Sequence, residues 1–552
     1  MLLTDTGTTG IIFKGIRPLQ RLGATALDIA LNNPLAEMAL QPRTPRRLKS
    51  IPPDPWPGDA QSGRDMVAGV FRFAGQSFEK DSLSWEPAGA SPEWVASLHG
   101  FEWLRDLRSV GSDRARRMAR EMVASWLGGY GKPHEIAWRP DITGVRVASW
   151  ISFHDFFCAA AGDEFRGAYF DSLLRQAKYL SRTLPGDLSG VALMRALKGL
   201  AFSGLALEDG EQRLEKAFTL ILRQVKEQIL PDGAHISRSP QATFEFLQCL
   251  VDLRAALIAA RLDMPEELQH GIDRITPAVK FFRHGDGGLA HFNGSQEGNA
   301  HLVETTLMHS GARGKAMKSL PHAGYERLLQ GRSSLIVDTG CGPEGRHGKR
   351  AHAGLLSFEY SYGRERVIVN CGSSAAAGRW RDLLRSTAAH STIVVDDRNA
   401  CPLEGQGSFS AQPELRKQRQ EDADIVVLDA GHGGYMPRFG LACRRFLRLQ
   451  EDGETLHGED ILSGKSGVHF AIRFHLHPSI QASVLKEGEE VLLSSKSGLG
   501  WKFRAPGVLL KLEDSVYGGE GEHPRRTRQI VLGGVTSGQK TLLEWELRRE
   551  KA

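Results

Sequence analysis

Two histidines and an asparagine in the C-terminal half have side chains that could hold a metal ion. His352 stands just before the first of three short strand-like segments, Asn370 ends the second, and His390 precedes the third. The three segments are rich in β-branched and aromatic residues and comprise Leu355–Tyr362, Arg366–Asn370 and Ser391–Val395. Antiparallel neighbours would bring the three polar ends together, and two imidazoles with an amide oxygen suit zinc. The sequence therefore predicts one zinc ion at this place; the alternative is a set of solvated or hydrogen-bonded side chains at strand ends.

Length and composition describe a soluble globular protein with more than one core. The chain has 552 residues, which favours two large domains, and it is 41% hydrophobic and 24% charged. A net charge of +5 mildly favours an acidic substrate. No dense basic block accompanies a recognition motif, so nucleic acid is not an expected partner. The six cysteines are scattered without a CxxC pair, which indicates free thiols in a reducing compartment.

The first residues of the chain carry no recognisable export signal. The stretch MLLTDTGTTGIIFKGIRPLQ has no basic region leading into a continuous apolar run. The chain also has no run of eighteen apolar residues that would predict a transmembrane segment. On these grounds alone, the sequence predicts a cytoplasmic protein.

The periodicity of apolar residues changes once along the chain and divides it into three parts. Residues 1–90 form an N-terminal arm and lead-in. From residue 91 to 310, successive segments have apolar residues at helical spacing; the first, Ser91–Leu107, begins with a Ser N-cap followed by Pro. From residue 325 to 552, short strand-like segments alternate with turns, which favours an antiparallel β-sandwich.

Four motifs resemble those of the heparinase II/III-like polysaccharide lyases. In the C-terminal half, RAHAG, NCG and AHST resemble the family's His-x-His-x-Asp, Asp-x-Gly and Ala-His-Asn-Thr motifs. In the helical part, PDGAHISRSPQATFEFL resembles Asp-Gly-x-His-x-x-x-Ser-Pro-x-Tyr-His. The motifs span Arg350–Gly354, Asn370–Gly372, Ala389–Thr392 and Pro231–Leu247. The resemblance implies an α+β multidomain fold, an N-terminal incomplete α/α toroid followed by a C-terminal antiparallel β-sandwich.

The family's reaction is β-elimination on uronic-acid polysaccharides, and this chain departs from the residues that perform it. A base removes the proton next to the uronate carboxylate, and an acid protonates the leaving oxygen. The family's tyrosine is replaced by Ala242, its first histidine by Arg350 and its aspartate by Asn370. The Asn after His390 is replaced by Ser391, and the helical Asn-His pair aligns with Gly190–Val191.

Other residues could take over the lost roles. The candidate catalytic residues are His235, Tyr435 and His352, and the candidate substrate-binding residues are Arg146, Trp150, Arg238 and Arg350. Arg146 and Trp150 resemble the family's Arg-x-x-x-Trp helix, and Tyr435 resembles its His-x-Gly-Tyr turn. Each has a structural alternative: a capping histidine, an ion-paired arginine, a core tryptophan, or a packed tyrosine with a bonded hydroxyl.

Three functions follow from these observations. The leading hypothesis is a polysaccharide lyase that cleaves an acidic polysaccharide of the bacterial cell envelope; for this function, the family resemblance implies the periplasm or envelope. The second is a catalytically degenerate, carbohydrate-binding relative. The third is a hydrolase that uses a carboxylate pair, for which Asp232 and Glu245 are the nearest candidates.

Overall fold

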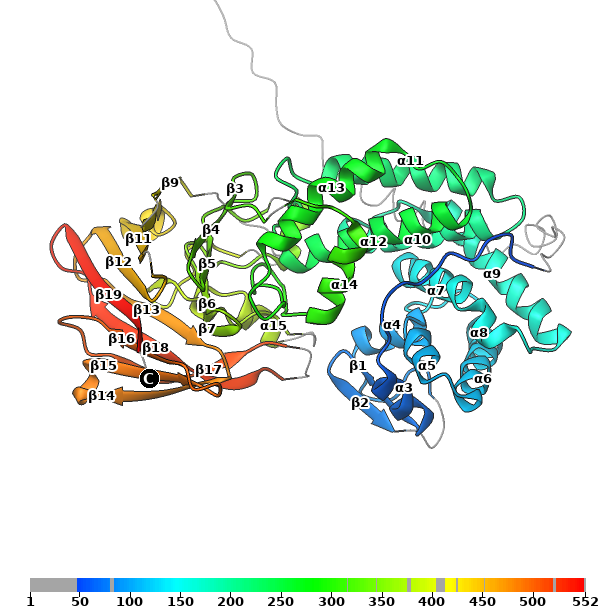
Figure 1. Ribbon diagram of the computed structural model, residues 1–552, viewed down its shortest axis with the longest axis horizontal. Coiled ribbons are helices and arrows are strands. Elements are labelled where there is room, and N and C mark those ends of the chain that lie inside the picture. Colours follow the sequence, from blue (N-terminus) through cyan, green and yellow to red (C-terminus); the bar gives the residue numbers. More distant parts are fainter. Residues whose placement is uncertain are drawn as a thin grey trace, which may run out of the picture.

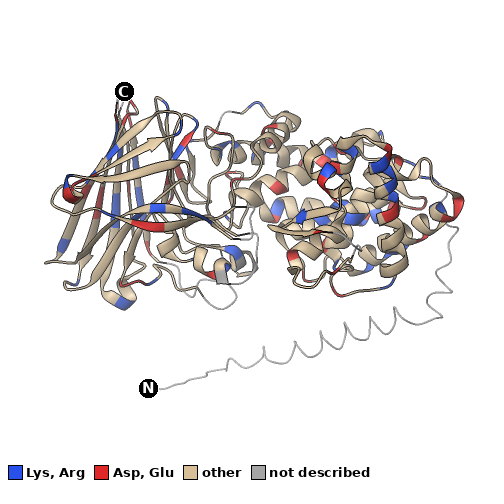
Figure 2. Ribbon diagram, turned by 90° about the horizontal axis from the view of Figure 1, so that it is seen from below, with Lys and Arg blue, Asp and Glu red and all other residues tan. Residues whose placement is uncertain are grey.

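The computed structural model has a helical N-terminal domain and a β-rich C-terminal domain, side by side along its long axis (Figure 1). It describes residues 47–79, 84–314, 316–343, 345–374, 379–403, 413–422, 425–450, 452–519 and 523–550. Residues 1–46 of the predicted N-terminal arm lie outside these ranges. Figure 2 shows basic and acidic residues interspersed over both domains, in keeping with the small net charge of +5.

The helical domain begins with a short helix and a hairpin and continues as successive helices. Its elements are α3 (Ala60–Val67), β1 (Val70–Phe73), β2 (Gln76–Glu79), α4 (Pro92–Gly100), α5 (Leu104–Val110), α6 (Asp113–Tyr130), α7 (Pro140–Ser152), α8 (His154–Cys158), α9 (Asp163–Thr183), α10 (Gly190–Ala206), α11 (Glu211–Gln228), α12 (Pro240–Ala259), α13 (Glu266–Phe281) and α14 (Ala300–Ser310). The prediction of one helix over Ser91–Leu107 is wrong, because Phe101 takes a left-handed backbone conformation (φ 61°) that separates α4 from α5.

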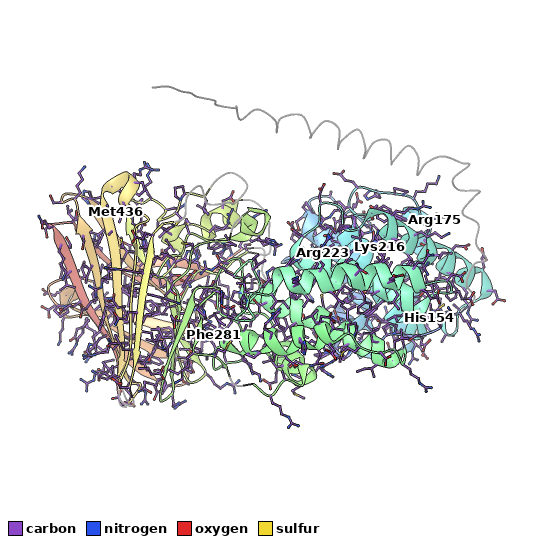
Figure 3. The ribbon with its side chains drawn as sticks, turned by 90° about the horizontal axis from the view of Figure 1, so that it is seen from above. His154, Arg175, Lys216, Arg223, Phe281 and Met436 are labelled. Atoms are coloured by element: carbon purple, nitrogen blue, oxygen red, sulfur yellow. The ribbon has the colours of Figure 1, made fainter. Side chains whose placement is uncertain are left out.

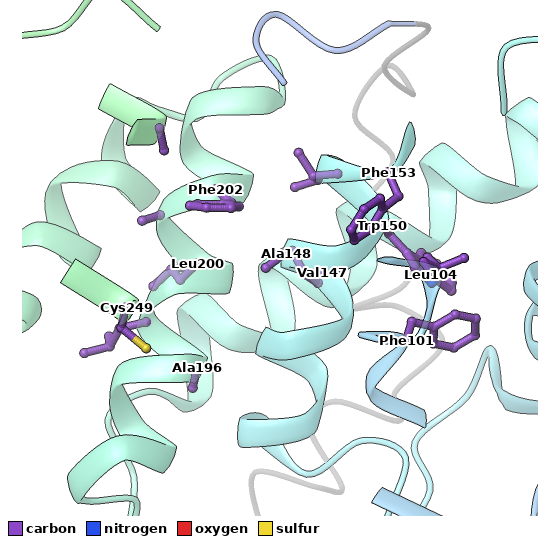
Figure 4. Close-up of a cluster of buried hydrophobic side chains, with 14 of the residues drawn as sticks. Phe101, Leu104, Val147, Ala148, Trp150, Phe153, Ala196, Leu200, Phe202 and Cys249 are labelled. Carbon is purple, nitrogen blue, oxygen red and sulfur yellow. The ribbon is translucent and has the colours of Figure 1, made fainter. Parts of the chain in front are cut away.

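Glycines allow the backbones of α7 and α10 to meet in the centre of this domain. A Cβ at Gly144 would lie 2.4 Å from Cα of Ala196, and a Cβ at Gly199 would lie 2.1 Å from the carbonyl oxygen of Gly144. Apolar side chains of both helices fill the space around this crossing, including Trp150 of α7 and Leu200 of α10 (Figure 4). The crossing fixes the N-terminal turns of α7 and α10 beside each other, where both helices line the candidate site.

The β-domain consists of two antiparallel sheets. Its strands are β3 (Ser319–Leu320), β4 (Tyr325–Gln330), β5 (Ser333–Asp338), β6 (Phe358–Tyr362), β7 (Glu365–Val369), β8 (Ile393–Val395), β9 (Leu415–Glu421), β10 (Ile425–His432), β11 (Leu441–Gln450), β12 (Thr455–Gly464), β13 (His469–Leu476), β14 (Ile480–Leu485), β15 (Glu490–Ser495), β16 (Gly500–Arg504), β17 (Lys511–Tyr517), β18 (Arg525–Val535) and β19 (Lys540–Glu550). One sheet has the order β14-β15-β16-β19-β12-β11-β10-β9. The other has the order β17-β18-β13-β7-β6-β5-β4-β3, with β8 paired to β13.

Short helices interrupt the strands, and two of them carry residues of the candidate site. The short elements are η1 (Gly345–Arg350), α15 (Arg379–Leu384), η2 (Thr387–Ala389), α16 (Met436–Phe439) and η3 (Lys486–Gly488). The sandwich core holds a stack of aromatic rings: Trp545 lies parallel to Phe358 and Phe503, with ring centroids 5.8 and 5.7 Å away. The core fixes the sheet that contains β5 and β7, the strands that precede η1 and α15 in the chain.

A smaller apolar cluster joins the two domains. Phe281 and Phe282 at the end of α13 pack with Tyr325 of β4 and Ile336 of β5. Figure 3 shows Phe281 between the helical end, marked by His154 and Arg175, and the sandwich end, marked by Met436. The arrangement confirms the predicted fold class, a helical toroid-like domain followed by an antiparallel β-sandwich. Within the described ranges, no helix combines the length and the apolar composition that crossing a membrane requires.

Candidate ligand-binding cleft

A cleft of about 470 Å³ lies where the helical domain meets the first segments of the β-domain. The N-terminal turns of α7 and α10 form one wall, and the turn before α12 forms another. His347 and Arg350 of η1 close it from the β-domain. Residues from both domains therefore line one cavity, as a site for an extended ligand requires.

His235 lines this cleft, but both of its ring nitrogens are engaged by the protein. The backbone N–H of Ser237 donates to Nδ1 (3.1 Å), so Nδ1 is an acceptor and the proton lies on Nε2. Nε2 then donates to Oε1 of Gln228 (2.8 Å). Burial lowers the pKa of His235 to about 3, so the ring is neutral at physiological pH. His235 is thus a poor base in this arrangement.

The turn that holds His235 is fixed by local sequence. Gly233 has φ +85°, and a Cβ there would lie 2.0 Å from the carbonyl oxygen of Arg274. Ser239 caps α12 by accepting from the backbone N–H of Ala242 (3.4 Å), and Pro240 takes the first helical position. The cap places Ala242 at the cleft wall, where the family's motif has a tyrosine. A methyl group there cannot transfer a proton.

Charged residues of both signs line the cleft. Arg195 of α10 lies 3.7 Å from the carboxylate of Glu102, and Glu245 of α12 accepts a hydrogen bond from Gln241 (2.8 Å). Gly190 and Val191 also line the cleft, so the position aligned with the family's Asn-His pair is at the site but has no polar side chain. These groups can bind a polar saccharide by hydrogen bonds and ion pairs.

The proposed carboxylate pair does not converge on the cleft. Both oxygens of Asp232 accept backbone N–H groups: Oδ1 from Ala234 (3.3 Å), and Oδ2 from His322 (2.7 Å) and Ala323 (2.8 Å). Glu245 lines the cleft, but Asp232 is not among the described lining residues. The structure offers no support for the pair of carboxylates that a hydrolase would use.

Two of the candidate metal ligands lie in direct contact. Nδ1 of His352 is 3.0 Å from Nε2 of His390. Nδ1 of His390 lies 2.7 Å from the carbonyl oxygen of Ser386, so it carries the proton and Nε2 is the acceptor. Burial lowers the pKa of His390 to about 4 and holds the pKa of His352 well below its usual range. The two neutral imidazoles are therefore joined by a hydrogen bond, in which Nδ1 of His352 donates to Nε2 of His390.

The third candidate ligand is committed elsewhere, so the residues present fit zinc poorly. Oδ1 of Asn370 accepts from the backbone N–H of Ser391 (3.0 Å). The described residues contain no group of three His, Cys, Asp or Glu side chains suited to a metal ion. Two neutral nitrogens and an engaged amide oxygen bring no negative charge to a buried dication. The zinc site stays a prediction, and no chemical step is derived through it.

Two candidate substrate-binding residues lie inside the helical domain instead of the cleft. Arg146 is fully buried and donates to Gln176 (2.7 Å) and to the carbonyl oxygens of Ala137 (2.7 Å) and His99 (3.0 Å). Burial without a carboxylate partner lowers the pKa of Arg146 to about 9. Trp150 is also fully buried and packs on Phe101, Trp126 and Tyr169.

Two further candidates, Arg238 and Tyr435, make structural contacts inside the protein. Arg238 bonds the carbonyl oxygen of Ala323 and the carboxylate of Asp338, linking the turn before α12 to the β-domain. Tyr435 is packed in the sandwich core, where its hydroxyl donates to the carbonyl oxygens of Arg398 (3.0 Å) and Ile393 (3.2 Å). Of the seven candidate catalytic and substrate-binding residues, His235, His352 and Arg350 reach a cavity.

The sequence analysis missed two cleft residues that have recognisable signals. Arg195 lies four positions after Val191 on α10 and therefore on the same face of the helix. Val191 is at the position aligned with the family's Asn-His pair, so that alignment could have pointed to Arg195. Asn293 precedes Gly294 in a turn-forming dipeptide. Its Oδ1 accepts from the backbone N–H of His352 (3.0 Å) and its Nδ2 donates to the hydroxyl of Tyr325 (2.7 Å).

The structure defines a two-domain protein, a helical toroid-like domain followed by a β-sandwich with a cleft between them, and comparison with known proteins identifies its family. The family "Heparinase II/III N-terminus" matches residues 61–307, and "Heparinase II/III-like, C-terminal" matches residues 312–546. The chain therefore belongs to the heparinase II/III-like family.

A relative and two solved structures are similar to most of the chain. "FtsZ-localized protein C" of Caulobacter vibrioides (strain NA1000 / CB15N) is 31% identical over 545 residues, covering 95% of this chain and 93% of the relative. Heparinase III has a similar structure, with a TM-score of 0.72, 14% identity, and coverage of 89% and 85% of the two chains. Heparan sulfate lyase HepC from Pedobacter heparinus has a TM-score of 0.58, 15% identity, and coverage of 89% and 83%. At these identities, the solved structures establish the fold alone.

Proposed function

We propose that this protein binds an acidic oligosaccharide in the cleft without cleaving it by β-elimination. The observation that carries the proposal is Ala242 at the cleft wall in the family's tyrosine position. No tyrosine is among the described residues that line the cleft. His235, an alternative base in the cleft, is neutral and has both nitrogens occupied. Proton transfer to and from the sugar therefore lacks its usual groups.

The groups that bind a saccharide persist in the same cleft. Arg195 and Arg350 supply cationic donors for a carboxylate, and Glu245 supplies a carboxylate acceptor. A guanidinium can bind a carboxylate through two parallel hydrogen bonds but cannot act as a base near neutral pH. These residues therefore support the binding of a saccharide without its cleavage.

One experiment separates binding from cleavage. Purified full-length protein is incubated with uronate polysaccharides; the ultraviolet absorbance of the unsaturated product reports cleavage, and calorimetry reports binding. We expect binding without an absorbance rise, and a loss of affinity of roughly tenfold in Arg195→Gln, since a hydrogen bond to a charged group is worth about that factor. Arg444→Gln, which removes a surface cation paired with Asp429, is the matched control.

A rise in absorbance would overturn the non-catalytic proposal. His347 is the remaining imidazole at the cleft wall, with its ring centroid 6.3 Å from that of His235. A rise that disappears in His347→Ala, but not in Arg444→Gln, would establish a lyase with a relocated acid or base. Absence of both binding and cleavage across the panel would refute the saccharide ligand itself.

A second role is favoured by the 31% identical relative. Because that protein is named for its localisation with FtsZ and the match covers 95% of this chain, we propose that this protein also associates with FtsZ. The test is co-sedimentation of the purified protein with polymerised FtsZ from the same organism, together with imaging of a fluorescent fusion. Absence from the FtsZ pellet and a uniform distribution in the cell would refute this role.

A further inference from the structure

A second cavity of about 210 Å³ adjoins the cleft on the side of the β-domain. The two cavities share Gln241, Gly294 and Arg350 as lining residues. The wall that belongs to the second cavity alone includes Arg381 of α15 and Arg385, which follows that helix. Neither arginine has a role in the family resemblance or in the saccharide contacts described above.

Arg385 is a buried cation with an unused donor. It is 8% exposed, and its Nε donates to the carbonyl oxygen of Ala351 (2.8 Å). Its Nη1 lies 3.9 Å from the carboxylate of Asp382, which is itself exposed. Its Nη2 is buried and has no hydrogen-bond partner among the described residues. A buried donor without an acceptor is costly, so the position is suited to an acceptor brought by a ligand.

The charge around this cavity is strongly positive. Three arginines, Arg350, Arg381 and Arg385, face one acidic residue, Glu93 of α4. His352 also lines the cavity. The lining residues therefore have a surplus of two positive charges, which the exposed Asp382 beside Arg385 offsets in part, and a phosphomonoester carries about −1.5 to −2 at neutral pH. A uronate or a sulfate ester carries a single negative charge and would leave the surplus partly uncompensated.

We propose that this cavity binds the phosphate group of a phosphorylated saccharide whose sugar lies in the adjoining cleft. The sugar part rests on the proposed function, whereas the phosphate part rests on the arginines alone. Planar guanidinium groups are the preferred partners of phosphate oxygens, since two parallel N–H donors match two oxygens. Gln241 and Gln296 line the same cavity, but their amide groups already donate to Glu245 (2.8 Å) and to the carbonyl oxygen of Gly519 (3.1 Å).

Small anions test the phosphate part on the full chain. Methyl phosphate and methyl sulfate have nearly the same shape but differ in charge, and acetate represents a carboxylate. Calorimetric titration is expected to show methyl phosphate binding at least about tenfold more tightly than methyl sulfate or acetate. Equal affinity for the three anions, or no binding of methyl phosphate, would overturn the proposal.

Variants locate the anion. Arg385→Gln and Arg381→Gln are each expected to weaken methyl phosphate binding by roughly tenfold or more. Glu93→Gln is expected to strengthen it, because that substitution removes the opposing charge. Arg381 is exposed, so its variant keeps the test valid if Arg385→Gln fails to fold, and Arg444→Gln is the matched control. An Arg381→Gln protein with unchanged affinity, or a Glu93→Gln protein with weaker affinity, would refute the assignment.

A sugar phosphate then separates this inference from the proposed function. Glucose 1-phosphate is expected to bind more tightly than methyl phosphate, and Arg195→Gln is expected to remove only that gain. If methyl phosphate binds but the sugar adds nothing, the saccharide proposal fails while the phosphate site stands. If uronate oligosaccharides bind and methyl phosphate does not, the phosphate site fails while the saccharide proposal stands.

Discussion

Replacing Arg238 with alanine is expected to loosen the junction between the two domains. Arg238 is 5% exposed, and its guanidinium carbon lies over the ring of Tyr325, 4.8 Å from the ring centroid. It bonds the carboxylate of Asp338, itself only 4% exposed, and the carbonyl oxygen of Ala323 (2.5 Å). Removing one partner of such a pair leaves a buried charge without compensation, which costs about 3–5 kcal/mol.

Urea unfolding followed by tryptophan fluorescence measures this loss. Arg444→Ala is the control, because its pair with Asp429 is partly exposed and is worth about 0–1 kcal/mol. Arg238→Met combined with Asp338→Leu is expected to recover much of the stability, because the double replacement removes both charges. A loss below about 1 kcal/mol in Arg238→Ala, or a loss of ligand affinity at unchanged stability, would refute the structural role and return Arg238 to the substrate-binding residues.

Three further changes test the helical core, the buried imidazole and the candidate metal site. Gly199→Ala is expected to cost about 1–3 kcal/mol or more, because its Cβ would lie 2.1 Å from the facing backbone; Gly128→Ala, with nothing within 4 Å, is expected to stabilise slightly in the same denaturation assay. The pKa of His235 is about 3 in the folded protein against an ordinary 6.5, so the unfolded state binds more protons between these values and the free energy of unfolding falls as pH falls. Between pH 7 and 5, His235→Gln is expected to lose about 2 kcal/mol less of this free energy than the wild type. Parallel pH profiles of the two proteins would contradict this. Elemental analysis is expected to find far less than one zinc per chain, with a melting temperature unchanged by chelator; one tightly held zinc would contradict the poor fit of the donors.

The fold was predictable because its signals are local and repeated. Helical spacing of apolar residues from Ser91 and short β-branched segments from Tyr325 each recur many times, so single errors do not change the architecture. The break at Phe101 was missed although Gly100 directly precedes it, because a single glycine inside a helical pattern does not by itself end a helix. A phenylalanine takes the left-handed conformation there, and its ring packs on Trp85 and Trp103, which only the tertiary structure reveals.

The site was only partly predictable, because a side chain's type does not disclose its partners. Arg146 and Arg350 are the same residue type, yet Arg146 is fully buried and donates to backbone carbonyl oxygens, whereas Arg350 is exposed at the cleft. Tyr435 has the right chemistry for an acid, but its hydroxyl is used by the sandwich core. Arg385 was passed over because its unused donor is visible only once its neighbours are placed.

Two departures from the family's metal motif, Asn370 and Ser391, are linked by a hydrogen bond. Asn370 accepts the backbone N–H of Ser391, and the Ser391 hydroxyl donates to the carbonyl oxygen of Val369 (2.7 Å). The same hydroxyl accepts from the backbone N–H of His475 (3.0 Å). The changed residues thus connect three strands of the sheet instead of coordinating an ion. Reversing one of them, for example by Asn370→Asp, would place a charge in this network without freeing the paired imidazoles, so a single substitution does not restore a metal site.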